Sequence, residues 1–419
     1  MEDRSNAVKP KANYKKVFLL GMSSFSDQLF WGIYNTDIPI IVQTVYHLSN
    51  TLTGWVMNID NILGLFLLPL VGMLSDRTNT KIGKRMPYIL GGLLGGAFFF
   101  FLISLFAHFE LPFIYVFLAI FFAVSAMSVQ RSPTIALMAD ITPKEDRAPA
   151  NSIMNLMTGI GGIFGILVVG MISSINRLLG FFVASIFIVI GAFAVFFSIN
   201  EKRDAKYRSE TDSEEPFSVL KSFGFLFKKE NTSLLFLLFA VAFGWIGVNT
   251  VETFYTAYMS MESGLQATIG EQMAKLNLSI FFIAFIAFSV PAGFLGKKYR
   301  RKLPMLVGLL GLVFVFGIVV FVKNYSIHKY LFALGGILWD LFIVNAIPTV
   351  IDFGTSETQG TYTGFYYLFS QTANIIAPVL AGSLADVFKT KFVIFPVSVF
   401  AFIISFTSLI FMRRVPIKD

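Results

Sequence analysis

The 419-residue chain is 55% hydrophobic and only 14% charged, with 49 Phe and a mean hydropathy of +0.72. These values lie far outside the range of soluble globular domains and indicate a polytopic membrane protein. Cysteine is absent, which excludes disulfides, thiolate metal sites and a cysteine nucleophile. The net charge of +8 does not indicate nucleic-acid binding, because the basic residues gather in alternate loops.

Twelve apolar runs are long enough to cross a hydrocarbon core of ~30 Å. The polar N-terminus leads into a first run that lacks a small-residue cleavage site, so we expect a retained helix rather than a signal peptide. Most of the 33 Lys and Arg residues lie in the tails and the even-numbered loops, so both termini are predicted to be cytoplasmic. The predicted spans are 17–42, 53–74, 87–107, 111–139, 150–172, 178–199, 232–259, 277–296, 303–322, 329–351, 360–386 and 391–412.

A long polar connection divides the predicted spans into two groups of six. We expect a cytoplasmic tail over 1–16, a six-helix bundle over 17–199, a cytoplasmic linker over 200–231, a second bundle over 232–412 and a tail over 413–419. The second span ends in GMLSDRTNTKIGKR and the eighth in GFLGKKYRRK, each a glycine followed by a short basic loop. This weak internal similarity is typical of secondary transporters, whose substrate sites lie near the membrane midplane.

Charged side chains within the predicted spans are informative, because each costs about 2.5 to 3.5 kcal/mol on insertion scales. They are Asp27, Asp37, Asp60, Arg131, Glu252 and Asp340. The histidines all fall between the predicted spans, which disfavours a histidine proton relay or an intramembrane metal site. These are His47, His108 and His328.

Asp27, Asp60 and Arg131 are the candidates for coupling transport to a proton. We expect Arg131 to face either Asp27 or Asp60; the sequence does not decide which, because that depends on helix rotation. A carboxylate that alternates between a desolvated site and a guanidinium partner binds and releases a proton. The alternative is a fixed salt bridge that only sets helix packing.

Polar and aromatic residues recur at helical spacing on several predicted spans, and such faces suit a sugar, whose hydroxyls bind amides and carboxylates and whose ring faces pack on aromatics. In the first bundle the lining candidates are Trp31, Tyr34, Asn35, Asn61 and Gln130. In the second they are Trp245, Asn249, Glu252, Trp339, Asp340, Asn345, Tyr367, Gln371 and Asn374. The alternative is a set of polar seams between packed helices.

A cytoplasmic cluster of acids and arginines marks the predicted inner ends of the first bundle. We interpret it as a gate, because surface ion pairs worth about 0.2 to 1 kcal/mol each bias a two-state equilibrium without freezing it. The gate candidates are Gly72, Asp76, Arg77, Arg85, Asp140 and Arg147. The alternative is that the basic residues are topology anchors.

Glycines crowd the fifth predicted span, where GIGGIFG covers residues 159–165. Small residues let the backbones of neighbouring helices approach closely. The run follows no strand and has no Lys-Ser or Lys-Thr ending, which argues against a phosphate-binding loop.

The loop Gly72-x-Leu74-Ser75-Asp76-Arg77, followed by Gly83-Lys84-Arg85, resembles the signature of the major facilitator superfamily. Three stretches are similar to its sucrose/proton symporter and glycoside-pentoside-hexuronide permease branch: IDNILGLFLLP (59–69), RSPTIALMADITPKEDRAPAN (131–151) and GTYTGFYYLFSQTANIIAP (360–378). The resemblance implies twelve transmembrane helices in two six-helix bundles and a solute permease for a sugar or glycoside driven by protons or another cation. Lys84-Arg85-Met86 replaces a more basic run, and Asp27 and Asp37 lie in a helix that often lacks acids, so the substrate does not carry over.

The sequence therefore predicts a proton-coupled symporter for a sugar or glycoside in the plasma (inner) membrane. We expect a monomer with no cofactor, no bound metal and no nucleic-acid partner. The alternatives are a sodium-coupled symporter or a drug or metabolite exporter of the same fold. A nontransporting sensor is the alternative from another class. We expect no enzymatic activity, because the predicted spans contain no His or Cys.

Overall fold

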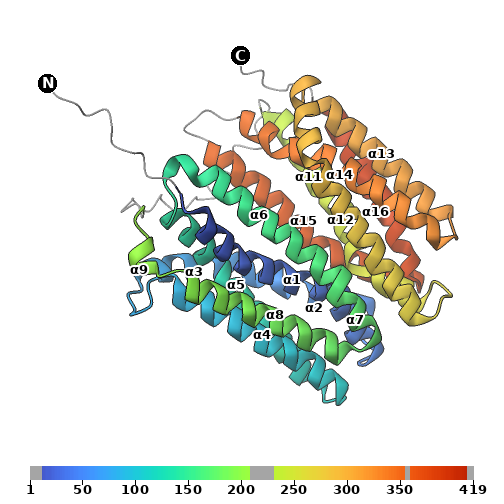
Figure 1. Cartoon of the computed structure of the whole chain (residues 1–419). Helices are drawn as coiled ribbons and strands as arrows, with labels where there is room; N and C mark the ends of the chain where they lie inside the picture. Colours follow the sequence, from blue (N-terminus) through green and yellow to red (C-terminus); the bar gives the residue numbers. More distant parts are fainter. Residues whose placement is uncertain (1–11, 208–230, 354–358, 413–419) are drawn as a thin grey trace. The chain divides into compact units, whose positions relative to one another are not determined.

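The computed structural model describes residues 12–207, 231–353 and 359–412, and these fold almost entirely into helices (Figure 1). The predicted tails, most of the linker and the loop at 354–358 lie outside the described residues. The first half contains α1 (Tyr14–Thr44), α2 (Asn50–Met57), α3 (Ile59–Arg77), α4 (Met86–His108), α5 (Phe113–Asp140), η1 (Lys144–Asp146), α6 (Arg147–Ile163), η2 (Phe164–Val169), α7 (Gly170–Ile175), α8 (Arg177–Ser198) and α9 (Glu201–Asp204). The second contains α11 (Thr232–Met261), α12 (Ala267–Lys298), α13 (Lys302–Phe321), α14 (Tyr325–Asp352), α15 (Gln359–Phe388), η4 (Lys391–Val393) and α16 (Ile394–Phe411).

The membrane-spanning helices agree with the predicted all-α fold, which is confirmed. Eleven helical stretches among the described residues are long and apolar enough to cross a membrane. The remaining expected span is α1, a helix of 31 residues. Its stretch SSFSDQ (23–28) is polar, which lowers the mean hydropathy of the helix.

Two predicted helix boundaries were wrong, and both errors concern charged or polar residues at the outer ends. Helix α12 begins at Ala267, well before the predicted start at 277, so Glu271 and Lys275 belong to the membrane helix. Helix α14 includes His328, which is 1% exposed. Its Nδ1 lies 3.1 Å from the hydroxyl of Tyr255. The expectation that every histidine lies between spans therefore fails for His328.

The chain divides by its internal contacts into two compact units. Unit 1 consists of Met1–Tyr34 and Ile62–Asp212, and unit 2 of Asn35–Asn61 and Ser213–Asp419. The outer end of α1 and all of α2 thus pack within unit 2. The predicted bundle limits at 199 and 232 describe chain topology and stay a prediction.

In unit 1, α4 packs against both α5 and α8 (Figure 1). Glycines permit the close approaches, as the sequence predicts for the fifth span. A Cβ atom on Gly165 would lie 2.8 Å from the carbonyl oxygen of Leu29 on α1, and one on Gly161 would collide with the carbonyl of Phe25. Asn176 begins α8 by accepting a hydrogen bond from the backbone N–H of Leu179.

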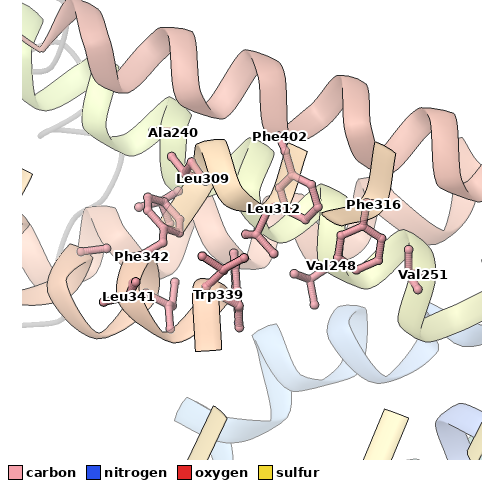
Figure 2. Packing of buried hydrophobic residues seen from close by; sticks show 14 of the residues in the cluster. Ala240, Val248, Val251, Leu309, Leu312, Phe316, Trp339, Leu341, Phe342 and Phe402 are labelled. Carbon is pink, nitrogen blue, oxygen red and sulfur yellow. The ribbon is translucent and has the colours of Figure 1, made fainter. Parts of the chain in front are cut away.

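In unit 2, α11 packs on α15 and α16, while α14 packs on α12 and α13. Its core is a continuous set of buried aliphatic and aromatic side chains. Figure 2 shows Trp339 and Phe342 of α14 among side chains from the neighbouring helices, including Leu309, Leu312 and Phe402. Helix α2 packs on α15, and its Gly54 lies against the backbone of Pro378. This packing fixes the outer end of the 35–61 segment within unit 2.

Candidate functional site

Asp27 is the centre of a polar network inside unit 1. It projects from α1 and is 8% exposed. The indole N–H of Trp31 donates to one of its oxygens at 3.2 Å, and the amide of Gln130 donates to the same oxygen at 2.8 Å. The guanidinium of Arg131 donates to the other at 3.1 Å. Asp27 is therefore a carboxylate held by one cation and two neutral donors.

A cavity of about 680 Å³ opens beside this network, entirely within unit 1. Its lining combines the Asp27–Arg131 pair with amides and hydroxyls from α1, α5 and α6. These polar lining residues are Ser24, Asp27, Gln130, Arg131, Ser132, Thr134, Asn151, Asn155 and Thr158. The volume lies within the roughly 300 to 1,000 Å³ typical of small-molecule sites.

The structure pairs Arg131 with Asp27, one of the two expected partners. Asp60 lies at the start of α3, where the amide of Asn61 donates to its carboxylate at 3.0 Å. Asp60 and Asn61 are both partly buried and belong to unit 2. The role of Asp60 in coupling stays a prediction.

The aromatic residues of the first span connect the Asp27 network to an aromatic core. Trp31 is 5% exposed, and the guanidinium carbon of Arg131 lies 5.1 Å from the centre of its ring. This contact adds a cation–π interaction to the ion pair with Asp27. Tyr34 is fully buried, stacks on Phe30 and lies edge-on to Trp31, with ring centres 5.4 Å apart. Trp31 therefore joins the Asp27 network to the core that contains Tyr34.

Asn35, one residue further along α1, belongs to unit 2. Its amide donates to the carboxylate of Glu252 on α11 at 3.2 Å. Both side chains are partly buried. The two lining candidates are thus brought together, although they come from opposite halves of the chain.

Helices α11 and α15 share a second chain of amides in unit 2. The amide of Asn249 donates to Asn374 at 2.6 Å, and Asn374 donates to Gln371 at 3.1 Å. Tyr367, one turn before Gln371, is 54% exposed on the surface of the unit. Trp245 lies one turn before Asn249 and packs edge-on against Trp339 at 5.2 Å. This group presents amides and aromatic rings on adjoining helices, as its spacing predicts.

The three candidates on α14 are all buried. Trp339 is part of the unit 2 core. Asp340 accepts a hydrogen bond from the hydroxyl of Ser289 at 3.0 Å. Asn345 donates to the backbone carbonyls of Leu341 and Ala292. These contacts give Asn345 a packing role between α12 and α14.

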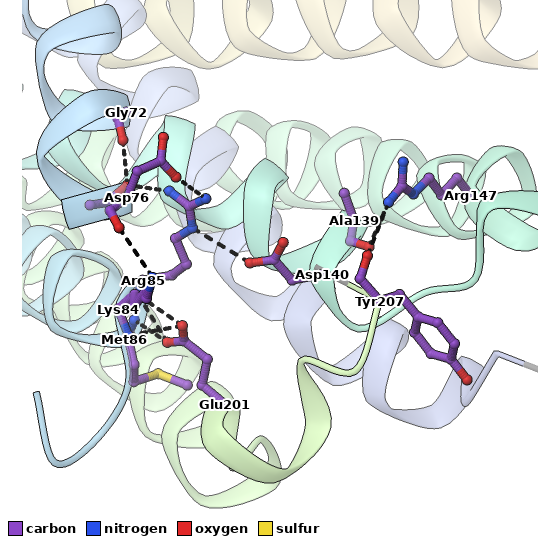
Figure 3. Close-up of polar contacts among 11 residues, drawn as sticks. Gly72, Asp76, Lys84, Arg85, Met86, Ala139, Asp140, Arg147, Glu201 and Tyr207 are labelled. Carbon is purple, nitrogen blue, oxygen red and sulfur yellow. Dashed lines mark hydrogen bonds and ion pairs between the residues drawn. The ribbon is translucent and has the colours of Figure 1, made fainter. Parts of the chain in front are cut away.

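The cytoplasmic cluster of unit 1 is built around Arg85 (Figure 3). Its guanidinium forms an ion pair with Asp76 at the end of α3 and lies 3.6 Å from the carboxylate of Asp140 at the end of α5. Ser75 also accepts a hydrogen bond from it. Three helix ends are therefore joined through one side chain that is only 8% exposed.

The other gate candidates surround that cluster without joining its ion pairs. Arg147 donates to the backbone carbonyls of Ala139 and Tyr207 (Figure 3). Arg77 is exposed at the end of α3. A Cβ atom on Gly72 would lie 3.0 Å from the hydroxyl of Ser132, so this glycine permits a close contact with α5.

Glu201 is a cluster residue that sequence reasoning missed. It is 1% exposed, and its carboxylate accepts hydrogen bonds from the backbone N–H groups of Lys84, Arg85 and Met86 (Figure 3). These are N–H groups at the start of α4, which have no partner inside the helix. The sequence placed Glu201 in a polar linker, and only its position four residues after Phe197, the last apolar residue of α8, could have marked it.

Lys275 and Glu271 were also missed, because the predicted eighth span began at 277. Lys275 is fully buried, with Glu271 at 2.7 Å and Asp37 at 2.8 Å from its ammonium. The i, i+4 spacing of Glu271 and Lys275 is a helical ion-pair signal that could have extended the predicted helix. Asp37 was recognised as an intramembrane charge without an assigned role.

Comparison with known proteins gives a consistent family. The model described as Major Facilitator Superfamily matches residues 20–274 and 253–419. The chain is 21% identical over 313 residues to the isoprimeverose transporter of Lactiplantibacillus pentosus, covering 72% of this chain and 64% of that protein. It is 26% identical over 173 residues to the general alpha-glucoside permease of Schizosaccharomyces pombe, covering 38% of this chain and 31% of that protein. It is 24% identical over 385 residues to multidrug resistance protein 2 of Bacillus subtilis, covering 90% and 91% of the two chains.

Solved structures share the fold at low sequence identity. The crystal structure of nucleoside transporter NupG superposes with a TM-score of 0.76 at 15% identity, covering 95% of this chain and 99% of that one. At that identity the likeness concerns the fold alone.

Proposed function

This chain belongs to the major facilitator superfamily, and we propose that it is a secondary active transporter that imports a sugar or glycoside together with a proton. It is a multi-pass membrane protein with transporter relatives, and we propose the plasma membrane as its location. The proposal includes a monomeric transporter without a cofactor or an enzymatic activity. Gradient-driven transport is the common task of this fold, but the fold does not set the substrate.

The pairing of Asp27 with Arg131 at the cavity carries the proposal. Asp27 reaches the cavity of about 680 Å³ together with its guanidinium partner. When the pair separates, a desolvated carboxylate favours a proton; when it reforms, the guanidinium favours release of that proton. Arg131 is 41% exposed at its side chain, so the pair can be reached by water and by a solute. We therefore propose Asp27 as the coupling carboxylate and Arg131 as the group that tunes it.

The polar lining supports a hydroxylated substrate. Asn151, Asn155 and Thr158 bring amides and a hydroxyl from α6 to the same cavity as Asp27. Such groups donate and accept hydrogen bonds without requiring a charged ligand. Two relatives are named for the isoprimeverose and the alpha-glucoside that they carry, which also supports a hydroxylated substrate. The lining candidates of unit 2 remain part of the proposal.

Export of an amphipathic compound is a second candidate. The observation that favours it is the likeness to multidrug resistance protein 2, which covers 90% of this chain. An exporter would use the same fold and the same buried acids with the opposite direction of substrate movement. Import could also be coupled to sodium, and uptake measurements under proton and sodium gradients distinguish these two cases.

Uptake into proteoliposomes tests the proposed function. Purified protein is reconstituted, and a panel of labelled mono- and disaccharides is offered under a proton gradient, a sodium gradient or no gradient. We expect one sugar to accumulate under the proton gradient alone. Accumulation under the sodium gradient alone would show that sodium, and not the proton, is the coupling cation. If no sugar is taken up under any gradient while an amphipathic compound is extruded, the export proposal replaces import.

A further inference from the structure

Three charged side chains meet in the outer part of unit 2, and none of them lines the cavity of unit 1. The ammonium of Lys275 on α12 lies 2.8 Å from the carboxylate of Asp37 on α1 and 2.7 Å from that of Glu271. Lys275 and Asp37 are fully buried, and Glu271 is 2% exposed. The hydroxyl of Thr36 donates to Asp37 at 2.9 Å. We call Asp37, Glu271 and Lys275 the outer charge cluster.

Asp37 and Lys275 lie at similar distances from the outer ends of their helices. Asp37 lies seven residues before Thr44, the last residue of α1, and Lys275 lies eight residues after Ala267, the first residue of α12. At ~1.5 Å per residue both are roughly 10 to 12 Å from the outer helix ends. The cluster therefore lies within the span and below the outer surface.

The two carboxylates hold Lys275 in different ways. Glu271 lies one turn before Lys275 on the same helix, so this pair persists whatever α12 does as a whole. Asp37 comes from α1, so its pair with Lys275 ties the outer end of α1 to α12. Removing one partner of a buried ion pair is expensive when it leaves a charge alone. Glu271 offers Lys275 a remaining carboxylate if Asp37 leaves.

The charge balance indicates what would make Asp37 leave. With all three groups ionised, the three side chains together carry one more negative than positive charge. A proton on Asp37 balances the three charges, converts the carboxylate to a neutral acid and leaves Lys275 with Glu271. The step forms one O–H bond and consumes one proton from the aqueous phase on the outer side.

We propose that Asp37 is a proton-binding site whose protonation releases the outer end of α1 from Lys275, with Glu271 receiving the ammonium. The proposal rests on the proposed function in one respect: it gives the coupling proton an outer site in addition to Asp27. In the described state the ionised carboxylate of Asp37 pairs with Lys275, and we call this ion pair the clasp. Proton binding opens it, and deprotonation closes it again.

Other titratable groups in the outer part of unit 2 have partners of their own. On α11, Glu252 accepts from Asn35, and the hydroxyls of Tyr255 and Tyr258 contact His328 and Tyr325 of α14. At the end of α11, Glu262 pairs with Lys391 and accepts its backbone N–H. Tyr362 and Tyr366 on α15 are buried. Asp386 of α15 accepts from the backbone N–H groups of Asn50 and Thr51, and His47 is exposed just after the end of α1.

Release of the clasp has a defined structural consequence in the 35–61 segment. Asp386 of α15 accepts hydrogen bonds from the backbone N–H groups of Asn50 and Thr51, and Asn58 donates to the carbonyl of Ile375. These neutral-donor contacts keep α2 on α15 in the described state. Gln43, near the end of α1, donates to Asn50 and Thr53 of α2. When α1 separates from α12, we therefore expect α2 to move with it and side chains on the buried face of α2 to become accessible.

The absence of cysteine from the chain makes this accessibility measurable with one introduced thiol. Val56→Cys places a thiol on the buried face of α2, where Val56 is 6% exposed. Leu52→Cys places one on the exposed face of the same helix, where Leu52 is 51% exposed. The full-length protein is treated with a membrane-impermeant maleimide over a pH series. The ratio of the two labelling rates cancels the effect of pH on the thiol itself.

We expect the rate ratio to rise as the pH falls, by up to about tenfold per pH unit, the limit for one bound proton. Asp37→Asn should give fast, pH-independent labelling, and Asp37→Glu should restore the pH dependence. Glu271→Gln should act in the opposite direction and slow the labelling, because it removes the carboxylate that receives Lys275. A cluster with only a packing role would loosen in both neutral variants.

The proposal is overturned if the rate ratio does not change with pH, or if Asp37→Asn and Glu271→Gln change it in the same direction. If Asp37→Asn does not fold, the proposal is still tested by the pH series with Asp37 intact and by the labelling rates of the Glu271→Gln variant. The measurement uses neither substrate nor gradient. A pH-dependent clasp in a protein that takes up no sugar would therefore count against the proposed function and leave this proposal standing.

Discussion

The carboxylate of Glu201 occupies the space that a side chain on Gly83 would need. Gly83 also has a φ of +124°, a backbone conformation that residues with a Cβ atom rarely adopt. The loop between α3 and α4 therefore depends on a glycine for two independent reasons. Both serve to bring the N–H groups that begin α4 onto one buried carboxylate.

Glu201→Ala should destabilise unit 1, because it leaves the N–H groups of Lys84, Arg85 and Met86 without their acceptor. We expect a loss of roughly 1 to 3 kcal/mol, the usual penalty for unsatisfied buried polar groups. Glu201→Gln keeps one acceptor oxygen and should lose less. Thermal unfolding in detergent measures the order of stability of the native protein and the two variants. Equal melting temperatures for all three proteins would contradict the capping role.

Gly161→Ala should destabilise the packing of α6 on α1, since its Cβ atom would collide with the carbonyl of Phe25. Overpacking of this kind costs typically about 1 to 3 kcal/mol. Gly91→Ala is the matched control, because a Cβ atom there meets nothing within 4 Å. We expect a lower melting temperature for Gly161→Ala and no decrease for Gly91→Ala. The reverse order would remove close backbone approach as the reason for the glycines.

Asp27→Asn and Arg131→Gln should each abolish proton-driven accumulation, because each breaks the proposed coupling pair. The double variant carries no unpaired charge and should recover part of the lost thermal stability, though not the accumulation. The single losses should stay below the roughly 3 to 5 kcal/mol known for fully buried pairs, because Arg131 is 41% exposed.

Asp60→Asn serves as the comparison, since Asp60 accepts a hydrogen bond from Asn61 within unit 2, whereas Asp27 pairs with Arg131. We expect it to retain accumulation. If Asp60→Asn loses accumulation while Asp27→Asn keeps it, the coupling role passes to Asp60.

Asp140→Asn should raise the rate at which the inner side of unit 1 opens, because it weakens the hold of Arg85 on the end of α5. The effect of one partly exposed ion pair is about 0.2 to 1 kcal/mol, so a change in transport rate of a few fold is expected. Arg77→Gln is the control, since Arg77 is exposed. Initial uptake rates at saturating substrate give the comparison. A larger effect from Arg77→Gln would contradict the proposal that Arg85 is the centre of a cytoplasmic gate.

Asp204 gives a pH dependence outside the membrane spans. Burial would raise its pKa, but hydrogen bonds from Arg203, Lys16 and the backbone N–H of Asn200 outweigh it and hold the pKa below its usual range. Because the folded-state pKa is the lower one, this group stabilises the fold above the unfolded pKa of ~3.9 and loses that contribution as the pH falls through the folded value. Asp204→Asn should lower the melting temperature at pH 7 and have little effect near pH 2. An equal effect at both values would contradict the linkage.

The sequence predicted the helices because membrane insertion leaves a strong signal in composition. Long apolar runs and the distribution of Lys and Arg follow directly from the bilayer. The boundaries at Ala267 and Tyr325 were missed because the outer ends of α12 and α14 carry polar side chains that unit 2 buries. Burial against other helices, and not lipid, satisfies Glu271, Lys275 and His328.

The candidate site was predictable in residue type and only partly in pairing. Periodicity placed Asp27 and Trp31 on one face of α1, and both reach the Arg131 network. The same pattern placed Tyr34 beside them, and its ring lies 5.4 Å from that of Trp31 while stacking on Phe30. Helical spacing gives the face of a residue and not the neighbour that covers that face, which is why Asp27 and Asp60 could not be separated.

The π-helical turn η2 in the fifth span acts as an insertion of one residue. A regular α-helix advances ~100° per residue, so this extra residue rotates everything after Val169 by about that angle relative to α6. Beyond the turn, Ser173 on α7 meets Gly180 of α8, while before it Gly161 meets α1. Deleting one residue from 164–169 would restore a regular helix and turn Ser173 away from Gly180. Any alignment of this span with a relative that lacks the turn therefore needs a one-residue gap at this point.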